Sequence, residues 1–162
     1  MKRVLWGVLL FTSLSSAQAQ QQEFSDLLEL YFGVVQAVAD QKSESAAQQA
    51  AICVGSFKTF PQDILNERQR NIWQERVPQV MNYLGELGAS TDAYHQQMAL
   101  KEGSKHLIEL VNQLDINHVE LYVLCSSQAE ACWLSRHAKG LNPFLQSGQK
   151  NDAKVTQTLA AH

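Results

Sequence analysis

The chain has 162 residues, with 13 basic and 16 acidic side chains and a formal net charge of −3 at pH 7. That length is enough for one domain with a hydrophobic core. The charges are spread along the chain without acidic or basic blocks. The negative balance argues against nucleic acid and anionic membrane surfaces as the main partners.

The N-terminus has the three parts of a secretory signal peptide. A Lys-Arg pair follows the initial Met, Val4–Leu14 is an apolar run, and Ala17 and Ala19 form the A-x-A pattern that signal peptidase accepts. The run is about half the length that a membrane-spanning helix needs. The sequence predicts a signal peptide over residues 1–19 and a mature chain in the periplasm or outside the cell of a Gram-negative bacterium. The alternative is a buried N-terminal helix.

Apolar side chains with the i, i+3, i+4 spacing of a helix face recur along most of the chain. Pro78 falls inside one of these stretches and should kink or restart that helix. The spacing predicts helices over residues 24–38, 46–54, 64–87 and 94–114.

The segment 119–125 fits two structures. Val119, Leu121, Val123 and Cys125 alternate as in a strand, but the apolar residues from Leu121 onward also follow helical spacing. A strand needs a partner, and no second strand is evident, so we favour a helix that bends near residue 126 and restarts, ending near residue 140.

These elements predict an all-α fold, a compact bundle of five or six amphipathic helices after the cleaved signal peptide. The helical domain should span residues 20–146. Residues 147–162 are polar and should form a mobile tail.

Three cysteines, Cys53, Cys125 and Cys132, lie in the predicted mature chain. An exported protein meets an oxidising compartment, which favours a disulfide. A bend near residue 126 would bring Cys125 within reach of Cys132, so we favour this pair; Cys53 with either partner, or no bond, are the alternatives. A zinc site of Cys125, Cys132 and His137 matches no standard spacing, and without a C-x-x-C motif a redox role is not favoured.

Glu102, His106 and Glu109 would share one helix face, at a spacing that can bind a metal or exchange protons. No second matching set accompanies them, so we interpret them as a solvated polar face. The motifs of haem attachment, metalloproteases, serine hydrolases and nucleotide binding are absent from the sequence. We therefore expect no catalytic residues, cofactor or metal, and a role in binding.

Three hypotheses follow from these expectations. The first is a protein-binding accessory factor such as a periplasmic chaperone for an exported partner. The second is an immunity or inhibitor protein that neutralises a toxin by direct binding. The third is an enzyme or metal carrier that uses the Glu102, His106 and Glu109 face. We favour the first, with a protein partner, no nucleic acid and no membrane span in the mature chain.

In length, signal peptide and overall character, the chain resembles the small exported accessory protein encoded beside the pore-forming cytolysin of vibrios. The resemblance implies a partner that is a secreted haemolysin, whose folding or export the protein would assist. It implies no particular functional residues, because no motif carries it.

Overall fold

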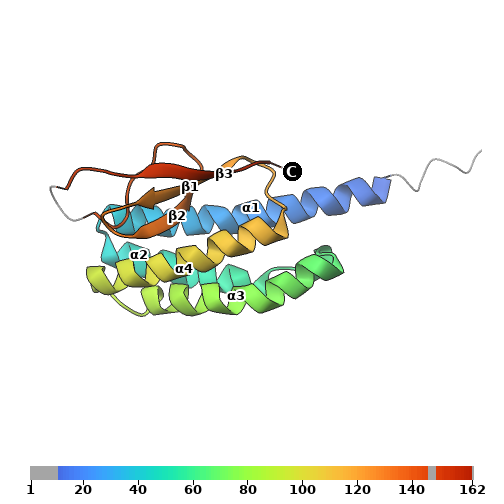
Figure 1. Ribbon diagram of the computed structural model, residues 1–162. Coiled ribbons are helices and arrows are strands. Elements are labelled where there is room, and N and C mark those ends of the chain that lie inside the picture. The colour runs from blue at the N-terminus through green and yellow to red at the C-terminus, as the bar shows by residue number, and fades with distance from the viewer. Residues whose placement is uncertain (1–10, 146–148, 162) are drawn as a thin grey trace, which may run out of the picture.

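A layer of three β-strands lies on a bundle of four α-helices in the computed structural model, which describes residues 11–145 and 149–161 (Figure 1). The predicted all-α bundle of five or six helices is therefore wrong. The elements are α1 (Phe11–Ala39), α2 (Ser43–Thr59), the 3-10 turn η1 (Gln62–Ile64), α3 (Glu67–Gly88), α4 (Ala93–Leu114), β1 (Leu121–Ser126), β2 (Ala131–Ser135) and β3 (Lys154–Leu159).

The four helices follow the predicted periodicity, although their ends differ. α3 begins with a capping box in which the Asn66 side chain accepts from the N–H of Gln69 and the Gln69 side chain accepts from the N–H of Asn66. α3 runs through Pro78 as one helix, so the proline does not divide it. No helix among the described residues is long and apolar enough to cross a membrane.

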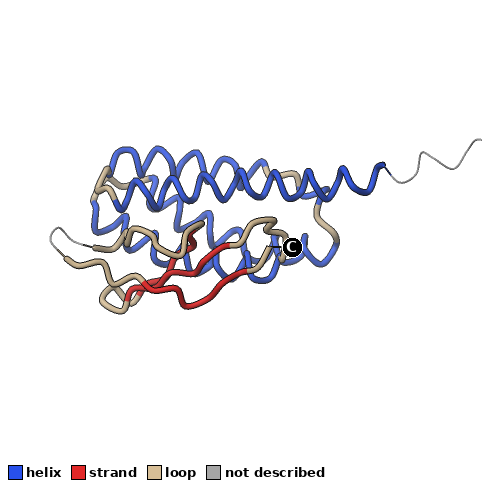
Figure 2. Tube along the Cα trace, turned by 90° about the horizontal axis from the view of Figure 1, so that it is seen from above, coloured by secondary structure: helices blue, strands red, loops and turns tan. Residues whose placement is uncertain are grey.

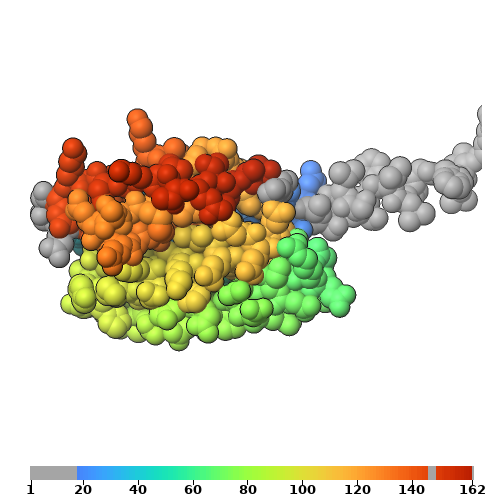
Figure 3. Space-filling model, viewed as in Figure 1, coloured from blue at the N-terminus to red at the C-terminus, as the bar shows by residue number. Residues whose placement is uncertain are grey.

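The strands are antiparallel in the order β2-β1-β3 and pack on α4 through β2. In the space-filling view, the orange hairpin and the red C-terminal segment form one layer above the yellow surface of α4 (Figure 3). The tube view shows the same strands gathered on one side of the helices (Figure 2). The segment 119–140, predicted as helix, is therefore a hairpin of β1 and β2.

Burial of apolar side chains from β1 stabilises the hairpin. Leu121 and Val123 are almost fully buried, as the strand interpretation of this segment requires, and a register shift after Val123 also places Leu124 in the core. The chain reverses between β1 and β2, where Glu130 takes a left-handed backbone conformation with φ of 49°. Cys125 lies opposite Cys132 in the register, and the two form a disulfide, the pair that the sequence favours.

The third strand lies within residues 147–162, the stretch expected to be a polar tail. β3 pairs with β1, and its residues from Lys154 to Thr158 are exposed. Asp152 joins the start of this segment to the hairpin, because its carboxylate accepts from the hydroxyl of Ser127 and the N–H of Gln128. Hydrogen bonds from the Ser126 hydroxyl and from that N–H lower the pKa of Asp152 to about 2.

A buried polar contact links three elements in the core. The hydroxyl of Tyr31 on α1 lies 2.7 Å from the hydroxyl of Ser104 on α4, and it accepts from the N–H of Leu134 on β2 at 3.4 Å. Neither Tyr31 nor Ser104 has exposed surface. This contact gives the Leu134 N–H a buried partner and ties β2 to α1 and α4 at this point.

Candidate functional site

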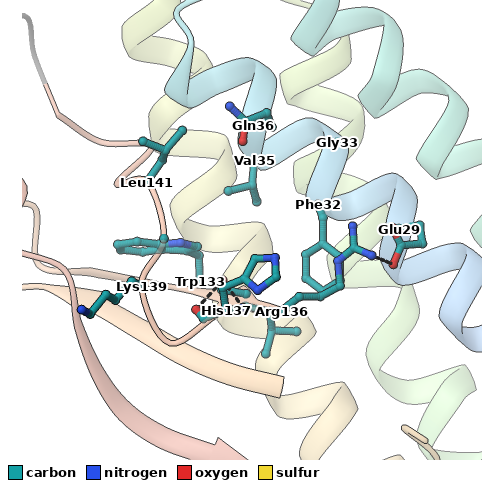
Figure 4. A pocket seen from close by; sticks show the side chains of 13 residues that line it. Glu29, Phe32, Gly33, Val35, Gln36, Trp133, Arg136, His137, Lys139 and Leu141 are labelled. Atoms are coloured by element: carbon teal, nitrogen blue, oxygen red, sulfur yellow. Dashed lines mark hydrogen bonds and ion pairs between the residues drawn. The ribbon is translucent and has the colours of Figure 1, made fainter. Parts of the chain in front are cut away.

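A hollow lies between α1 and β2, beside the loop that follows β2 (Figure 4). We call it the α1–β2 groove. It has a volume of about 550 Å³ and is open to solvent on one side. It is lined by Glu29, Phe32, Gly33, Val35 and Gln36 from α1, and by the consecutive residues Trp133, Leu134, Ser135, Arg136 and His137, followed by Lys139, Gly140 and Leu141.

Apolar side chains from both elements form the floor of the groove. Phe32 and Val35 come from α1, and Trp133 comes from β2 (Figure 4). Trp133 is 1% exposed, and its ring meets that of Phe144 edge to face at 5.6 Å between centroids. Leu141, by contrast, is 53% exposed at the groove. Of these apolar side chains, Leu141 therefore offers a ligand far more exposed surface than Trp133.

The loop after β2 supplies the basic side chains. Arg136, His137 and Lys139 all line the groove. Ser135 fixes the start of this loop, since its hydroxyl donates to the carbonyl of His137 at 2.9 Å and accepts from the N–H of the same residue at 3.0 Å. Gly140 lets the loop lie close to β1, because a Cβ there would come within 2.7 Å of a Leu124 methyl carbon.

One ion pair crosses the groove between its two walls. Nη1 of Arg136 lies 2.6 Å from Oε1 of Glu29, and its guanidinium lies over the Phe32 ring at 5.3 Å (Figure 4). The side chains of Arg136 and Glu29 are 49% and 45% exposed. An ion pair this exposed stabilises a fold by only about 0.2–1 kcal/mol. The pair can therefore open at small cost.

The groove has the composition of a recognition site. It combines an apolar floor with a few charged groups, the usual character of a recognition site. Among the charged residues that line it, Arg136 and Glu29 form an ion pair.

The face predicted from Glu102, His106 and Glu109 lies on α4, away from the groove. His106 stacks on Tyr83 of α3 at 5.5 Å, and Glu109 pairs with Arg76 of α3 at 3.2 Å. These contacts hold α3 against α4. Among the described residues, no group of three or more His, Cys, Asp or Glu side chains could hold a metal ion.

The predicted zinc set is divided by the structure. Cys125 and Cys132 are joined in the disulfide, so their sulfurs are not free thiolates, while His137 lines the α1–β2 groove. Of the predicted cleavage residues, Ala17 and Ala19 lie on α1, and Ala19 is exposed.

Cys53 is buried on α2 with no exposed surface, and burial raises the pKa of its thiol from 9.0 to about 12. The unfolded chain loses this proton at lower pH, so the free energy of unfolding should fall as the pH rises from 9 to 12. We expect Cys53→Ala to lack this contribution. Urea unfolding from pH 8 to 11 should show the stability difference, wild type minus variant, decreasing; a constant difference would contradict the prediction.

Sequence reasoning missed the groove, because it placed residues 129–140 in a helix. A local signal was present: Arg136, His137 and Lys139 fall within four positions of an otherwise acidic chain. Their neighbours Glu29 and Phe32 lie more than 100 positions earlier, and no local pattern connects the two segments.

No family model, curated protein or solved structure matches the chain. Its function therefore has to be inferred from the groove and from the chemistry of its sequence.

Proposed function

We propose that the chain is an exported, non-enzymatic protein-binding factor. It acts in the periplasm or outside the cell as a chaperone-like accessory protein for a secreted toxin or haemolysin. The observation that carries the proposal is the α1–β2 groove, where an apolar floor and basic side chains line one open hollow of about 550 Å³. Such a surface suits a segment of another protein that presents apolar and acidic side chains.

One feature of the sequence and one of the structure support export. The signal-like segment 1–19 has a positive start, an apolar run and the A-x-A pattern; residues 1–10 lie outside the described residues. Cleavage after Ala19 would retain Gln20, whose side-chain amide donates to Gln69 of α3 at 2.8 Å. The Cys125–Cys132 disulfide agrees with an oxidising compartment. The toxin or haemolysin as partner rests on the resemblance stated above.

Site-directed photocrosslinking tests the proposal. A benzophenone amino acid is placed at Leu141 in the groove or at Ile52 on α2, which is a matched control because the two side chains are 53% and 57% exposed. Each protein is irradiated in periplasmic extract and culture supernatant of the source cells. We expect one exported protein crosslinked through position 141 and absent at position 52. The yield of that protein in active form should fall when the gene of this chain is deleted.

Each other outcome decides against the proposal. Equal crosslinking at both positions would show no use of the groove, and the absence of any adduct would defeat the proposal. A crosslinked toxin whose activity the purified protein blocks would assign the immunity role instead. Turnover of a substrate by the purified protein would overturn the non-enzymatic assignment.

A further inference from the structure

Two basic side chains lie on the loop that lines the groove. The chain has a net charge of −3, yet Arg136 and Lys139 bring two positive charges to one loop. Glu29 is the acidic residue among those that line the groove. The local charge therefore favours an anionic group in the ligand.

Glu29 marks where a carboxylate binds in this groove. Its Oε1 lies 2.6 Å from Nη1 of Arg136, whose guanidinium lies over the Phe32 ring. A guanidinium in this position holds a carboxylate directly beside an aromatic wall. Because Glu29 and Arg136 are both about half exposed, another carboxylate can reach the same guanidinium from solvent.

The apolar part of the site lies next to this carboxylate position. Phe32 on α1 is half-buried beside the Arg136 guanidinium, whereas Val35 and Trp133 line the groove but are almost fully buried (Figure 4). Leu141 adds an exposed apolar side chain from the loop. Apolar side chains on either side of a ligand carboxylate would thus have surfaces to contact.

We propose that the α1–β2 groove binds a partner's peptide segment in which one Asp or Glu lies between apolar residues, and that Glu29 competes with this carboxylate for Arg136. The inference rests on the proposed function and names the ligand chemistry of the same groove. Glu29 occupies the guanidinium in the free protein and releases it when the partner's carboxylate binds.

This competition gives the two members of the ion pair opposite effects. Glu29→Gln removes the internal competitor and leaves Arg136 free, so the affinity for the peptide should rise. Arg136→Gln removes the group that both carboxylates use, so the affinity should fall. If the pair served only to hold α1 against the loop, the two variants would change the affinity in the same direction.

Fluorescence anisotropy with labelled peptides measures this directly. The probe is the acetylated peptide GSLFELFSG, and the matched probe GSLFQLFSG lacks the charge. We expect Glu29→Gln to bind the first probe about threefold more tightly, in keeping with an exposed ion pair. We expect Arg136→Gln to bind it about tenfold more weakly. The uncharged probe should bind wild type weakly and respond to neither substitution.

Controls separate these effects from a general change in charge or folding. Glu44→Gln on α2 and Arg68→Gln on α3 change the same charges at exposed positions outside the groove, and should leave the affinity unchanged. Circular dichroism of each variant checks that it is folded.

Three results would overturn the inference. They are a change of peptide affinity in the same direction for Glu29→Gln and Arg136→Gln, equal affinity for the two probes, and no binding of either probe. Dodecanoate is tested as a third ligand. If it binds wild type but not Arg136→Gln, and neither peptide binds, the ligand of the groove is a small amphiphilic carboxylate and not a peptide. A partner crosslinked at position 141 together with failure of both peptides would sink this inference and leave the proposed function standing.

Discussion

Trp133→Ala is expected to lower the free energy of unfolding by about 3–5 kcal/mol. Trp133 is 1% exposed and packs edge to face on Phe144, so its removal leaves a large cavity between the sheet and the helices. A domain of this size is typically stable by about 5–15 kcal/mol in total. Urea unfolding followed by circular dichroism measures the loss, and a change below about 1 kcal/mol would contradict the close packing of Trp133 in the core.

The same substitution should also weaken binding at the α1–β2 groove, because the buried Trp133 ring supports the groove from below. Trp73→Ala is the matched control. Trp73 is 2% exposed, stacks on Phe60 at 4.1 Å, and does not line the groove. We expect both variants to lose stability by similar amounts, whereas only Trp133→Ala should lose affinity for the acidic peptide under conditions where both are folded.

Removal of the disulfide is expected to lower the free energy of unfolding by about 2 kcal/mol. Cys125 and Cys132 are seven positions apart and close a short loop across the hairpin, so their bond restricts the unfolded chain less than a long loop would. The double variant Cys125→Ser/Cys132→Ser suits this test, since both side chains are partly exposed. Urea midpoints of the variant and the oxidised protein give the difference.

Reduction provides the internal check on the disulfide prediction. Dithiothreitol should lower the midpoint of the wild-type protein to nearly that of the double variant and should leave the double variant unchanged. Cys53 is buried and unpaired, so it does not contribute to this response. A wild-type midpoint that is insensitive to reduction would show that the bond does not stabilise the hairpin.

Helix positions were predictable because the information for them is local. A helix buries one face, and the periodicity of that face is visible within a few turns, as in α4, where Asp92 also caps the first turn through the N–H of His95. The strand alternation of residues 119–125 was equally visible. It was rejected because no partner strand could be identified, and that decision produced the incorrect all-α fold.

The partner strands were hidden for different reasons. β2 has five residues and lies where helical spacing is also satisfied. β3 is polar and exposed along most of its length, so it lacks the apolar alternation by which strands are recognised. β3 is held by backbone pairing with β1 and by the contacts of Asp152, which depend on residues about 25 positions away.

The sequence by itself determined the four helical segments, the favoured cysteine pair and the absence of known catalytic motifs from the chain. Only the tertiary structure decided that the C-terminal third forms a sheet and that α1 and β2 enclose a groove. The physical reason is the separation along the chain of the residues that interact. Periodicity and capping act between neighbours in the chain, whereas Glu29 and Arg136 meet only because the sheet packs on the helices and brings distant segments together.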